Sequence, residues 1–169
     1  VNYVARWDGS GWHSLSSGTS WHVFALEVMN DDLYIGGNFS TVGGLANANR
    51  LGRWDGSNWH VLDTVGNLPD DTVLALAADG SDLYITGAFE NAGDQTVNHI
   101  VKWSSGGWSS LGEGLREGVP STQGSALAIG TGWIYVGGNF QKADTRYASN
   151  IAAWDKKSWA TRGSGLNGA

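Results

Sequence analysis

The stretch Leu33–Trp59, LYIGGNFSTVGGLANANRLGRWDGSNW, recurs along this chain in altered form. It returns as Leu83–Trp108 and as Ile134–Trp159, and a truncated copy, YVARWDGSGW, occupies Tyr3–Trp12. Two tryptophans frame a short box in each copy, and they stand at Trp7, Trp54, Trp103 and Trp154 and at Trp12, Trp59, Trp108 and Trp159. Both series advance by 47, 49 and 51 residues. A period near 50 with so many anchors in register indicates a repeat architecture.

Each full repeat is predicted to hold four short strands. In the first repeat, apolar runs separated by turn signals predict strands at His22–Met29, Leu33–Phe39, Arg50–Asp55 and Asn58–Leu62. Asx-Gly pairs beside apolar residues are strong hairpin signals, and they occur at Asp8-Gly9, Asp55-Gly56 and Asp79-Gly80. A four-stranded antiparallel meander of about 50 residues, repeated around an axis, is a β-propeller blade. A stacked β-solenoid is the alternative, although its repeats are usually shorter.

The repeats predict an all-β chain of about three and a half blades. Residues 1–18 are expected to form the outer half of a blade, residues 19–66, 67–115 and 116–165 three whole blades, and residues 166–169 the start of the next linker. Propellers close with about four to eight blades, so this ring is incomplete. Because natural proteins avoid open sheet edges, we expect a segment of a longer propeller or a propeller completed by a partner.

The composition of the 169 residues excludes several classes of protein. Hydrophobic residues make up 41% and charged residues 15%, which suits a folded protein rather than a disordered one. The formal net charge of −6 argues against nucleic acid as a partner, because phosphate binding needs clustered Lys and Arg. No apolar run approaches the roughly 20 residues of a membrane helix, so membrane insertion is not expected. The absence of cysteine excludes disulfides and thiol chemistry, and we expect Val1 to be a mature or trimmed terminus.

Apolar residues that recur with the repeat are expected to pack between blades. Small residues recur on the first strand, nearest the axis, at Ala25, Ala75 and Ala126. The diglycine Gly36-Gly37 should let a neighbouring ring lie directly on the backbone. The box tryptophans Trp54 and Trp59 should both be largely buried against an adjacent blade.

Charged residues that recur with the repeat are expected to have structural roles. Turn formation is the expected role of the box aspartates Asp8, Asp55 and Asp155, rather than a carboxylate site. Ion pairing between blades, or packing of the side-chain stem, is expected for the cations Arg6, Arg53 and Lys102.

The histidines do not form a recognisable site. His13 and His60 occupy equivalent places in successive repeats, on outer strands too far apart to share a metal. His22 and His99 have no partner at metal-ligand spacing. No nucleophile elbow, phosphate-binding loop or calcium loop is present in the sequence. We therefore expect no catalytic residue, no metal site, no cofactor and no enzyme activity.

The repeat also resembles a known family. A diglycine after an apolar strand, followed by an aromatic-Asp turn and a tryptophan, is similar to the repeats of kelch and galactose-oxidase propellers. The pattern N-x-I-A-R-W-D-G-x-x-W of kelch-like repeats in bacterial secreted proteins and fungal cortical-marker surface proteins is similar to Asn2–Trp12. The third box, WSSGGW, departs from this pattern because it lacks the aspartate. The resemblance implies a propeller that acts as a binding scaffold, outside the cell or at its surface, with the periplasm as the alternative.

Ligand contacts in a repeat protein are expected where the copies differ. Two tryptophans fall outside the box register, and a histidine follows the first of them at the entry to a first strand. Divergent loops and the linker before the last repeat add arginines, a glutamate and a tyrosine. These candidate ligand-binding residues are Trp21, His22, Arg116, Glu117, Trp133, Arg146 and Tyr147. Exposed rings beside polar groups suit a sugar or a protein contact.

The leading functional hypothesis is a noncatalytic scaffold for protein–protein interaction or assembly at the cell surface. Its partner would be another polypeptide that completes the propeller and pairs along Val4–Trp7, the edge of the truncated copy that lacks a neighbouring strand. A lectin-like propeller that binds a glycan is the second hypothesis. An accessory propeller segment of a larger enzyme is the third.

Overall fold

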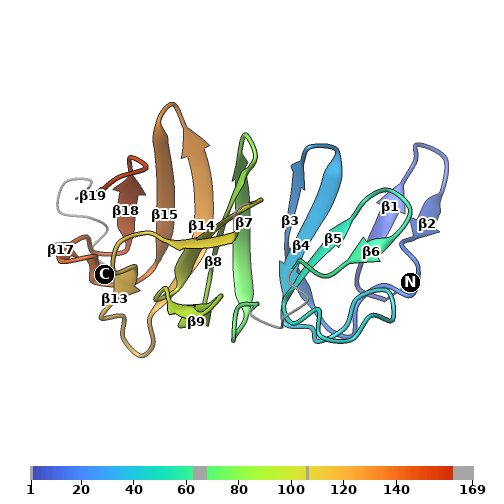
Figure 1. The fold of residues 1–169 in the computed structure, drawn as a ribbon, viewed down its shortest axis with the longest axis horizontal. Helices are drawn as coiled ribbons and strands as arrows, with labels where there is room; N and C mark the ends of the chain where they lie inside the picture. Colours follow the sequence, from blue (N-terminus) through green and yellow to red (C-terminus); the bar gives the residue numbers. More distant parts are fainter. Residues whose placement is uncertain (1, 63–67, 106, 162–169) are drawn as a thin grey trace.

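The structure is a computed structural model that describes residues 2–62, 68–105 and 107–161. It is all-β, and the described residues contain no helix. Within the same ranges no helix is therefore long and apolar enough to cross a membrane. The strands form antiparallel sheets of two to four strands. Figure 1 shows these sheets in a row that follows the order of the chain.

Four units follow one another along the row. The N-terminal hairpin consists of β1 (Ala5–Trp7) and β2 (Trp12–Ser14). The first sheet has the order β3 (Val23–Met29), β4 (Asp32–Gly37), β5 (Leu51–Trp54) and β6 (Trp59–His60). The second sheet has the order β7 (Val73–Asp79), β8 (Asp82–Gly87), β11 (Ile100–Ser104) and β12 (Gly107–Ser110). The third sheet has the order β14 (Gln123–Gly130), β15 (Trp133–Asn139), β18 (Ile151–Trp154) and β19 (Trp159–Thr161).

Two small sheets are built from the loops. The strands β9 (Asn91–Ala92) and β10 (Gln95–Thr96) pair with each other. The strands β13 (Leu115–Arg116), β16 (Lys142–Ala143) and β17 (Arg146–Tyr147) form a three-stranded sheet in that order. In Figure 1 both lie along the lower edge, away from the hairpin turns that join β7 to β8 and β14 to β15.

The four-strand reading of each repeat is confirmed. The predicted strands of the first repeat match β3 to β6 to within about two residues at each end, which is the usual uncertainty of strand ends. The turn glycines Gly9, Gly56 and Gly80 all have positive φ, as their hairpin positions require. The expected boundary between residues 66 and 67, the stretch Gly163–Ala169 and the expected linker at 166–169 lie outside the described residues.

Three apolar clusters each join two consecutive units. One joins the N-terminal hairpin to the first sheet, the next joins the first and second sheets, and the last joins the second and third sheets. The first strands of the three sheets are neighbours, because β3 packs against β7 and β7 packs against β14. A Cβ on Gly36 would collide with Val73 and touch Leu76, so the expected neighbouring ring is wrong and aliphatic side chains of β7 lie there. Gly37 instead lies against the backbone at His22.

The two box tryptophans are not equally buried. Trp59 and Trp159 are buried, and their indole N–H groups donate to the carbonyls of Leu15 (2.9 Å) and Leu111 (2.7 Å). The expectation that Trp54 is also largely buried is wrong, because this ring is only half-buried. In the first and third sheets the second tryptophan of the box is therefore the one that packs the outer strand pair against the preceding unit.

Candidate functional site

The outward face of β3 is apolar and exposed. The exposed fractions of Phe24, Leu26 and Val28 are 51%, 58% and 64%. In the repeat register Leu26 corresponds to Leu76 of β7, which is 7% exposed because it packs on the first sheet. A contiguous apolar face of this kind on a soluble chain indicates an interaction surface. We call Phe24, Leu26 and Val28 the open face.

The edge of β1 beside the open face is unpaired. The corresponding strands β5, β11 and β18 have a partner strand on each side. Within the described residues β1 pairs with β2 alone. The N–H of Asp8 donates to the carbonyl of Gly11 (3.2 Å), so by antiparallel alternation the N–H groups of Ala5 and Trp7 point away from β2. The edge thus offers unmet backbone donors and acceptors.

A groove separates the N-terminal hairpin from the first sheet. Its volume is about 260 Å³, and its lining includes Ala5, Arg6, Leu15, Val28, Leu33 and Trp54. A hollow of about 290 Å³ occupies the corresponding place between the second and third sheets, where the lining includes Asp82, Tyr84, Lys102, Leu111 and Trp154. Tyr84 and Asp82 come from β8, the second strand of its sheet. Beside the hairpin groove, no second strand pairs with β1 among the described residues.

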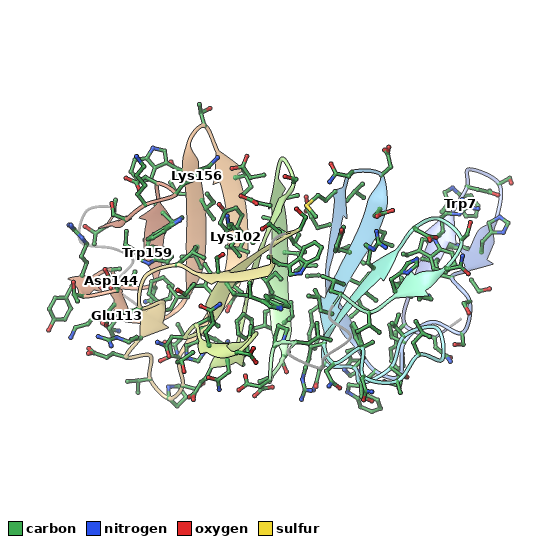
Figure 2. The ribbon with its side chains drawn as sticks, viewed as in Figure 1. Trp7, Lys102, Glu113, Asp144, Lys156 and Trp159 are labelled. Atoms are coloured by element: carbon green, nitrogen blue, oxygen red, sulfur yellow. The ribbon has the colours of Figure 1, made fainter. Side chains whose placement is uncertain are left out.

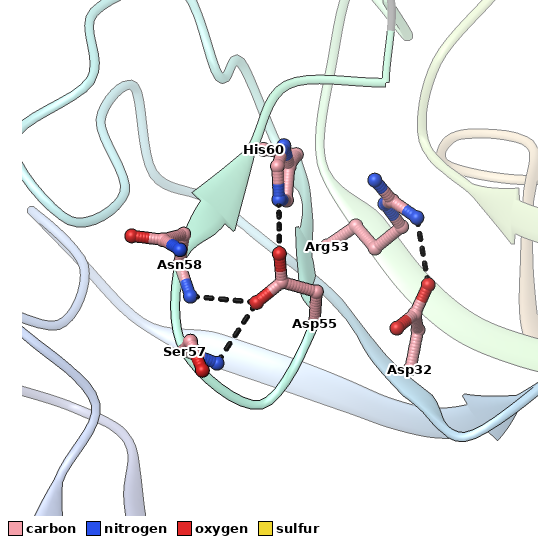
Figure 3. A network of polar contacts seen from close by, with 6 residues as sticks. All are labelled: Asp32, Arg53, Asp55, Ser57, Asn58 and His60. Carbon is pink, nitrogen blue, oxygen red and sulfur yellow. Dashed lines mark hydrogen bonds and ion pairs between the residues drawn. The ribbon is translucent and has the colours of Figure 1, made fainter.

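Two ion pairs link the second and third strands of the sheets. Arg53 pairs with Asp32 (2.7 Å, Figure 3), and Lys102 pairs with Asp82 (3.2 Å). Both pairs lie within one sheet, so the expectation that these cations pair between blades is wrong. Arg6, the third cation of this series, has no acidic partner among the described residues.

One ion pair does join two sheets. Lys156 of the third sheet pairs with Asp79 of the second sheet (2.6 Å). Figure 2 shows Lys156 and Lys102 on the same part of the molecule, whereas Trp7 stands at the opposite end. Sequence reasoning missed this pair because Lys156 replaces the turn glycine found in the first two boxes.

The box aspartates shape their turns, as predicted. Asp55 Oδ1 accepts hydrogen bonds from the N–H groups of Ser57 (2.8 Å) and Asn58 (2.7 Å), and Oδ2 lies 2.6 Å from His60 Nε2 (Figure 3). The bond to His60, followed by the two backbone bonds, lowers the pKa of Asp55 well below its usual range. Asp8 makes the same set of bonds in the N-terminal hairpin, and its pKa is lowered for the same reasons, with the backbone bonds first.

Of the candidate ligand-binding residues, Trp21 and His22 lie together near the open face. Their ring centroids are 4.9 Å apart, and Tyr3 lies 6.0 Å from Trp21 and 5.4 Å from His22. The His22 ring also lies 6.0 Å from Phe24 of the open face. We call Tyr3, Trp21, His22 and Phe24 the ring cluster. Sequence reasoning missed Tyr3 and Phe24, although the run of apolar residues on both faces of β3 signals a strand without a solvated face.

Four other candidates lie together in the small sheet β13–β16–β17. Arg116 pairs with Glu113 (2.8 Å), and Glu117 accepts from Lys142 (2.7 Å). The Lys142 ammonium also lies 4.9 Å from the ring centre of Tyr147, and Arg146 precedes that tyrosine on β17. This cluster is internally paired, which makes it a weaker candidate for a ligand. Trp133 is apart from it, since it begins β15 whereas the cluster lies past the other end of that strand, roughly 20 Å away.

In the part of the chain that the structure describes, no three His, Asp or Glu side chains gather as a metal site would require. His99 is buried, and burial lowers its pKa, although backbone hydrogen bonds at Ala88 and Gly87 and nearby acidic side chains oppose this shift. Its Nδ1 has no hydrogen-bond partner.

No protein-family model matches the chain, and no curated protein matches it significantly.

Proposed function

We propose that this chain is part of a β-propeller and acts as a noncatalytic binding and assembly module, outside the cell or at its surface. The observation that carries the proposal is the open face, which exposes three apolar side chains on the first strand of a sheet. The equivalent face of β7 is covered by the first sheet, and that of β14 lies against the second sheet. The open face therefore has the composition of an interface between sheets.

The arrangement of the sheets supports a propeller. Three four-stranded sheets stand in series with their first strands adjacent, as blades do around an axis. A further sheet on the N-terminal side of the first sheet would cover the open face in the way that the first sheet covers β7. Assembly through this face follows from the same packing that joins the blades to one another.

Photo-crosslinking from the open face tests the proposed function. A photoreactive amino acid replaces Leu26 in the protein produced by its natural source, and mass spectrometry identifies the residues that crosslink to it. We expect crosslinks to one defined polypeptide segment. The same substitution at Tyr147, which is also exposed but lies in the third repeat, is the control and should give no such crosslink. Solvent adducts alone at both positions would refute assembly through the open face.

A lectin-like function is the second candidate, and the ring cluster is the observation that favours it. Trp21 and Tyr3 are each half exposed and lie with His22 beside them. Aromatic faces next to polar groups are suited to stacking on a sugar ring. Binding to a glycan array that is lost in Trp21→Ala, with an unchanged melting temperature, would support this function. An array without any binding would exclude it for the glycans tested.

A further inference from the structure

The backbone at Tyr3 is shaped to receive a strand. Tyr3 has φ 61°, and its equivalents Arg50, His99 and Asn150 have φ 65°, 71° and 72°. A left-handed backbone is unfavourable for Tyr and Arg and better tolerated by His and Asn, so its recurrence across all four residue types reflects a requirement of the repeat. In the three full repeats this residue makes two backbone hydrogen bonds to the C-terminal end of the strand that precedes it. Its N–H donates to a phenylalanine carbonyl, and its carbonyl accepts from a glycine N–H, as for Arg50 with Phe39 (2.8 Å) and Gly37 (3.0 Å).

Tyr3 has the same backbone shape without these partners. No backbone group of the described residues bonds to its N–H or its carbonyl. The two bonds in each full repeat come from a Gly-x-Phe segment, at Gly37–Phe39, Gly87–Phe89 and Gly138–Phe140. A strand that ends in Gly-x-Phe would satisfy both groups of Tyr3 in the same way.

The charge on Arg6 adds a second requirement. The cations Arg53 and Lys102 each pair with an aspartate that begins the second strand, Asp32 and Asp82. In the third sheet both partners change together, because Ala153 replaces the cation and Trp133 replaces the aspartate. A cation at this position therefore goes with an acid at the start of the second strand. Arg6 forms no ion pair within the described residues, although Asp31 lines the same groove, so the place of a second-strand acid beside Arg6 is unfilled.

The hairpin groove adds a third requirement, an aromatic ring. The second-strand tyrosines Tyr34 and Tyr84 are buried against the next sheet, where Tyr34 lies 5.9 Å from Trp103 and Tyr84 lines the hollow beside Trp154. Burial raises the pKa of Tyr84 to about 12. Trp54 is the tryptophan equivalent to Trp103 and Trp154. It borders the hairpin groove, whose lining includes no tyrosine.

The N-terminal end of β3 adds a fourth requirement, a residue without a side chain. In neighbouring sheets one large and one small residue meet: Gly36 faces Val73, and Gly124 faces Thr86. A Cβ on either glycine would collide with the larger partner. The first sheet carries Val23 at this place, in register with Val73 and Gly124. Its missing neighbour must therefore be glycine.

We propose that a β-hairpin of the repeat's inner half docks beside the N-terminal hairpin, and that its second strand reads Asp-apolar-Tyr-apolar-Gly-Gly-x-Phe. This strand adds to the free edge of β1 and pairs antiparallel with it, a mode of binding known as β-augmentation. The aspartate pairs with Arg6, the tyrosine fills the groove at Trp54, and the first glycine covers Val23. The first strand of the hairpin covers the open face. This inference rests on the proposed function and names the chemistry of the partner.

A second copy of the described residues does not fit this role. The second strands β4, β8 and β15 already pair on both sides, so none is free to add to β1 of another molecule. The docking hairpin is therefore an additional inner half-repeat, outside the described residues.

A grafted chain tests the inference. A second copy of residues 20–49, which contains Asp32, Tyr34, Gly36 and Phe39, is joined directly before Tyr3 of the otherwise complete chain. The graft holds the hairpin at high effective concentration beside the groove. We expect the amides of Ala5 and Trp7 to exchange with deuterium at least about tenfold more slowly than in the ungrafted chain. The amides of the second sheet report that the molecule has folded in both cases.

Matched grafts test the chemistry of the hairpin. Replacing the grafted tyrosine by serine, or the grafted first glycine by threonine, should abolish the added protection, and Arg6→Gln should reduce it by about threefold. The glycine-to-threonine graft is the sharpest control because Thr86 is native in the second repeat. The same segment, added as a free peptide at millimolar concentration to the ungrafted chain, provides a second measurement should a graft fail to fold.

Several outcomes would overturn the inference. Equal protection by the serine graft would refute the role of tyrosine, and no protection by any graft or by the peptide would refute docking at β1. Slow exchange of Ala5 and Trp7 in an ungrafted monomer would show that the edge is already satisfied. A dimer of the ungrafted chain with these amides protected would assign the edge to a second copy. Crosslinks from Leu26 to a segment without this pattern would leave the proposed function intact and refute only the inferred hairpin.

Discussion

The N-terminal hairpin and the outer strands of the first sheet carry nearly the same sequence in different surroundings. The rings of Trp7 and Trp12 lie 5.5 Å apart, and those of Trp54 and Trp59 lie 5.2 Å apart. Yet Trp12 is 69% exposed whereas Trp59 is 6% exposed. The local geometry of the box is thus a property of its own residues. Burial of the box is set by the preceding unit, which the N-terminal hairpin lacks within the described residues.

Replacing the second box tryptophan should give the largest difference in lost stability between the two regions. Trp59→Ala removes a buried ring and its hydrogen bond to Leu15, so we expect it to lower the free energy of unfolding by about 3–5 kcal/mol. Trp12→Ala should lower it by less than about 1 kcal/mol, because its ring is mostly in water. Urea denaturation followed by circular dichroism measures both. Equal losses would mean that the N-terminal hairpin is as firmly packed as the first sheet.

Alanine substitutions at the equivalent leucines of the first strands should differ almost as much in their effect on stability. Leu76→Ala opens a cavity between the first and second sheets and should cost about 2–4 kcal/mol. Leu26→Ala should change the free energy of unfolding by less than about 0.5 kcal/mol, since Leu26 lies on the open face. Melting curves of the two variants, at several protein concentrations, provide the measurement. A loss at Leu26 that is present at high protein concentration and vanishes on dilution would reveal that copies of the chain cover this face themselves.

Substitutions of the equivalent cations Arg53 and Arg6 should show a smaller difference in lost stability. Arg53→Gln removes a partly exposed ion pair with Asp32 and should cost less than about 1 kcal/mol, with a smaller loss at high salt. Arg6→Gln should leave the stability unchanged, because Arg6 forms no ion pair within the described residues. Unfolding at low and high salt tests both variants. A salt-sensitive loss in Arg6→Gln would point to an acidic partner already in place.

The box aspartates should show the smallest effect, seen only in acid. Their folded-state pKa values are lowered, so the bonds of Asp55 stabilise the fold above its ordinary pKa of 3.8 and are lost as the pH falls below it. Asp55→Asn should therefore flatten the decline in stability between about pH 4 and pH 2. Asp8→Asn should alter this decline less, because the N-terminal hairpin contributes less to global unfolding. Denaturant midpoints of both variants and of the unchanged chain, measured across this pH range, test both expectations.

Much of the fold was predictable because its signals are local. Hairpin turns follow from Asx-Gly pairs, and strands follow from short apolar runs between them, so the four strands of the first repeat were placed within a few residues. The pairing of Trp21 with His22 and the grouping of Arg116, Glu117 and Tyr147 also follow from loop positions. The isolation of Trp133 from that group was not foreseen, because a loop's divergence does not reveal at which end of the strands it lies.

The candidate site itself depended on non-local packing. Leu26 and Leu76 are the same residue in the same register, and only one of them has a sheet against it. The linked replacement of Lys102 and Asp82 by Ala153 and Trp133 was visible in the sequence, but its meaning required the ion pair. This linked replacement could be interpreted only once the contacts between neighbouring strands were known.

The sequence by itself determined the repeat register, the all-β strands and the chemistry of the box turns, since these depend on residues close together in the chain. The tertiary structure decided which copies of the same motif are buried. Trp59 and Trp12, or Leu76 and Leu26, differ only in what stands beside them. Apolar burial is set by neighbouring surfaces contributed by distant residues, and no local pattern reveals whether that neighbour is present. For this reason the open face emerges only from the packed structure, whereas the free edge of the truncated copy follows from the repeat count alone.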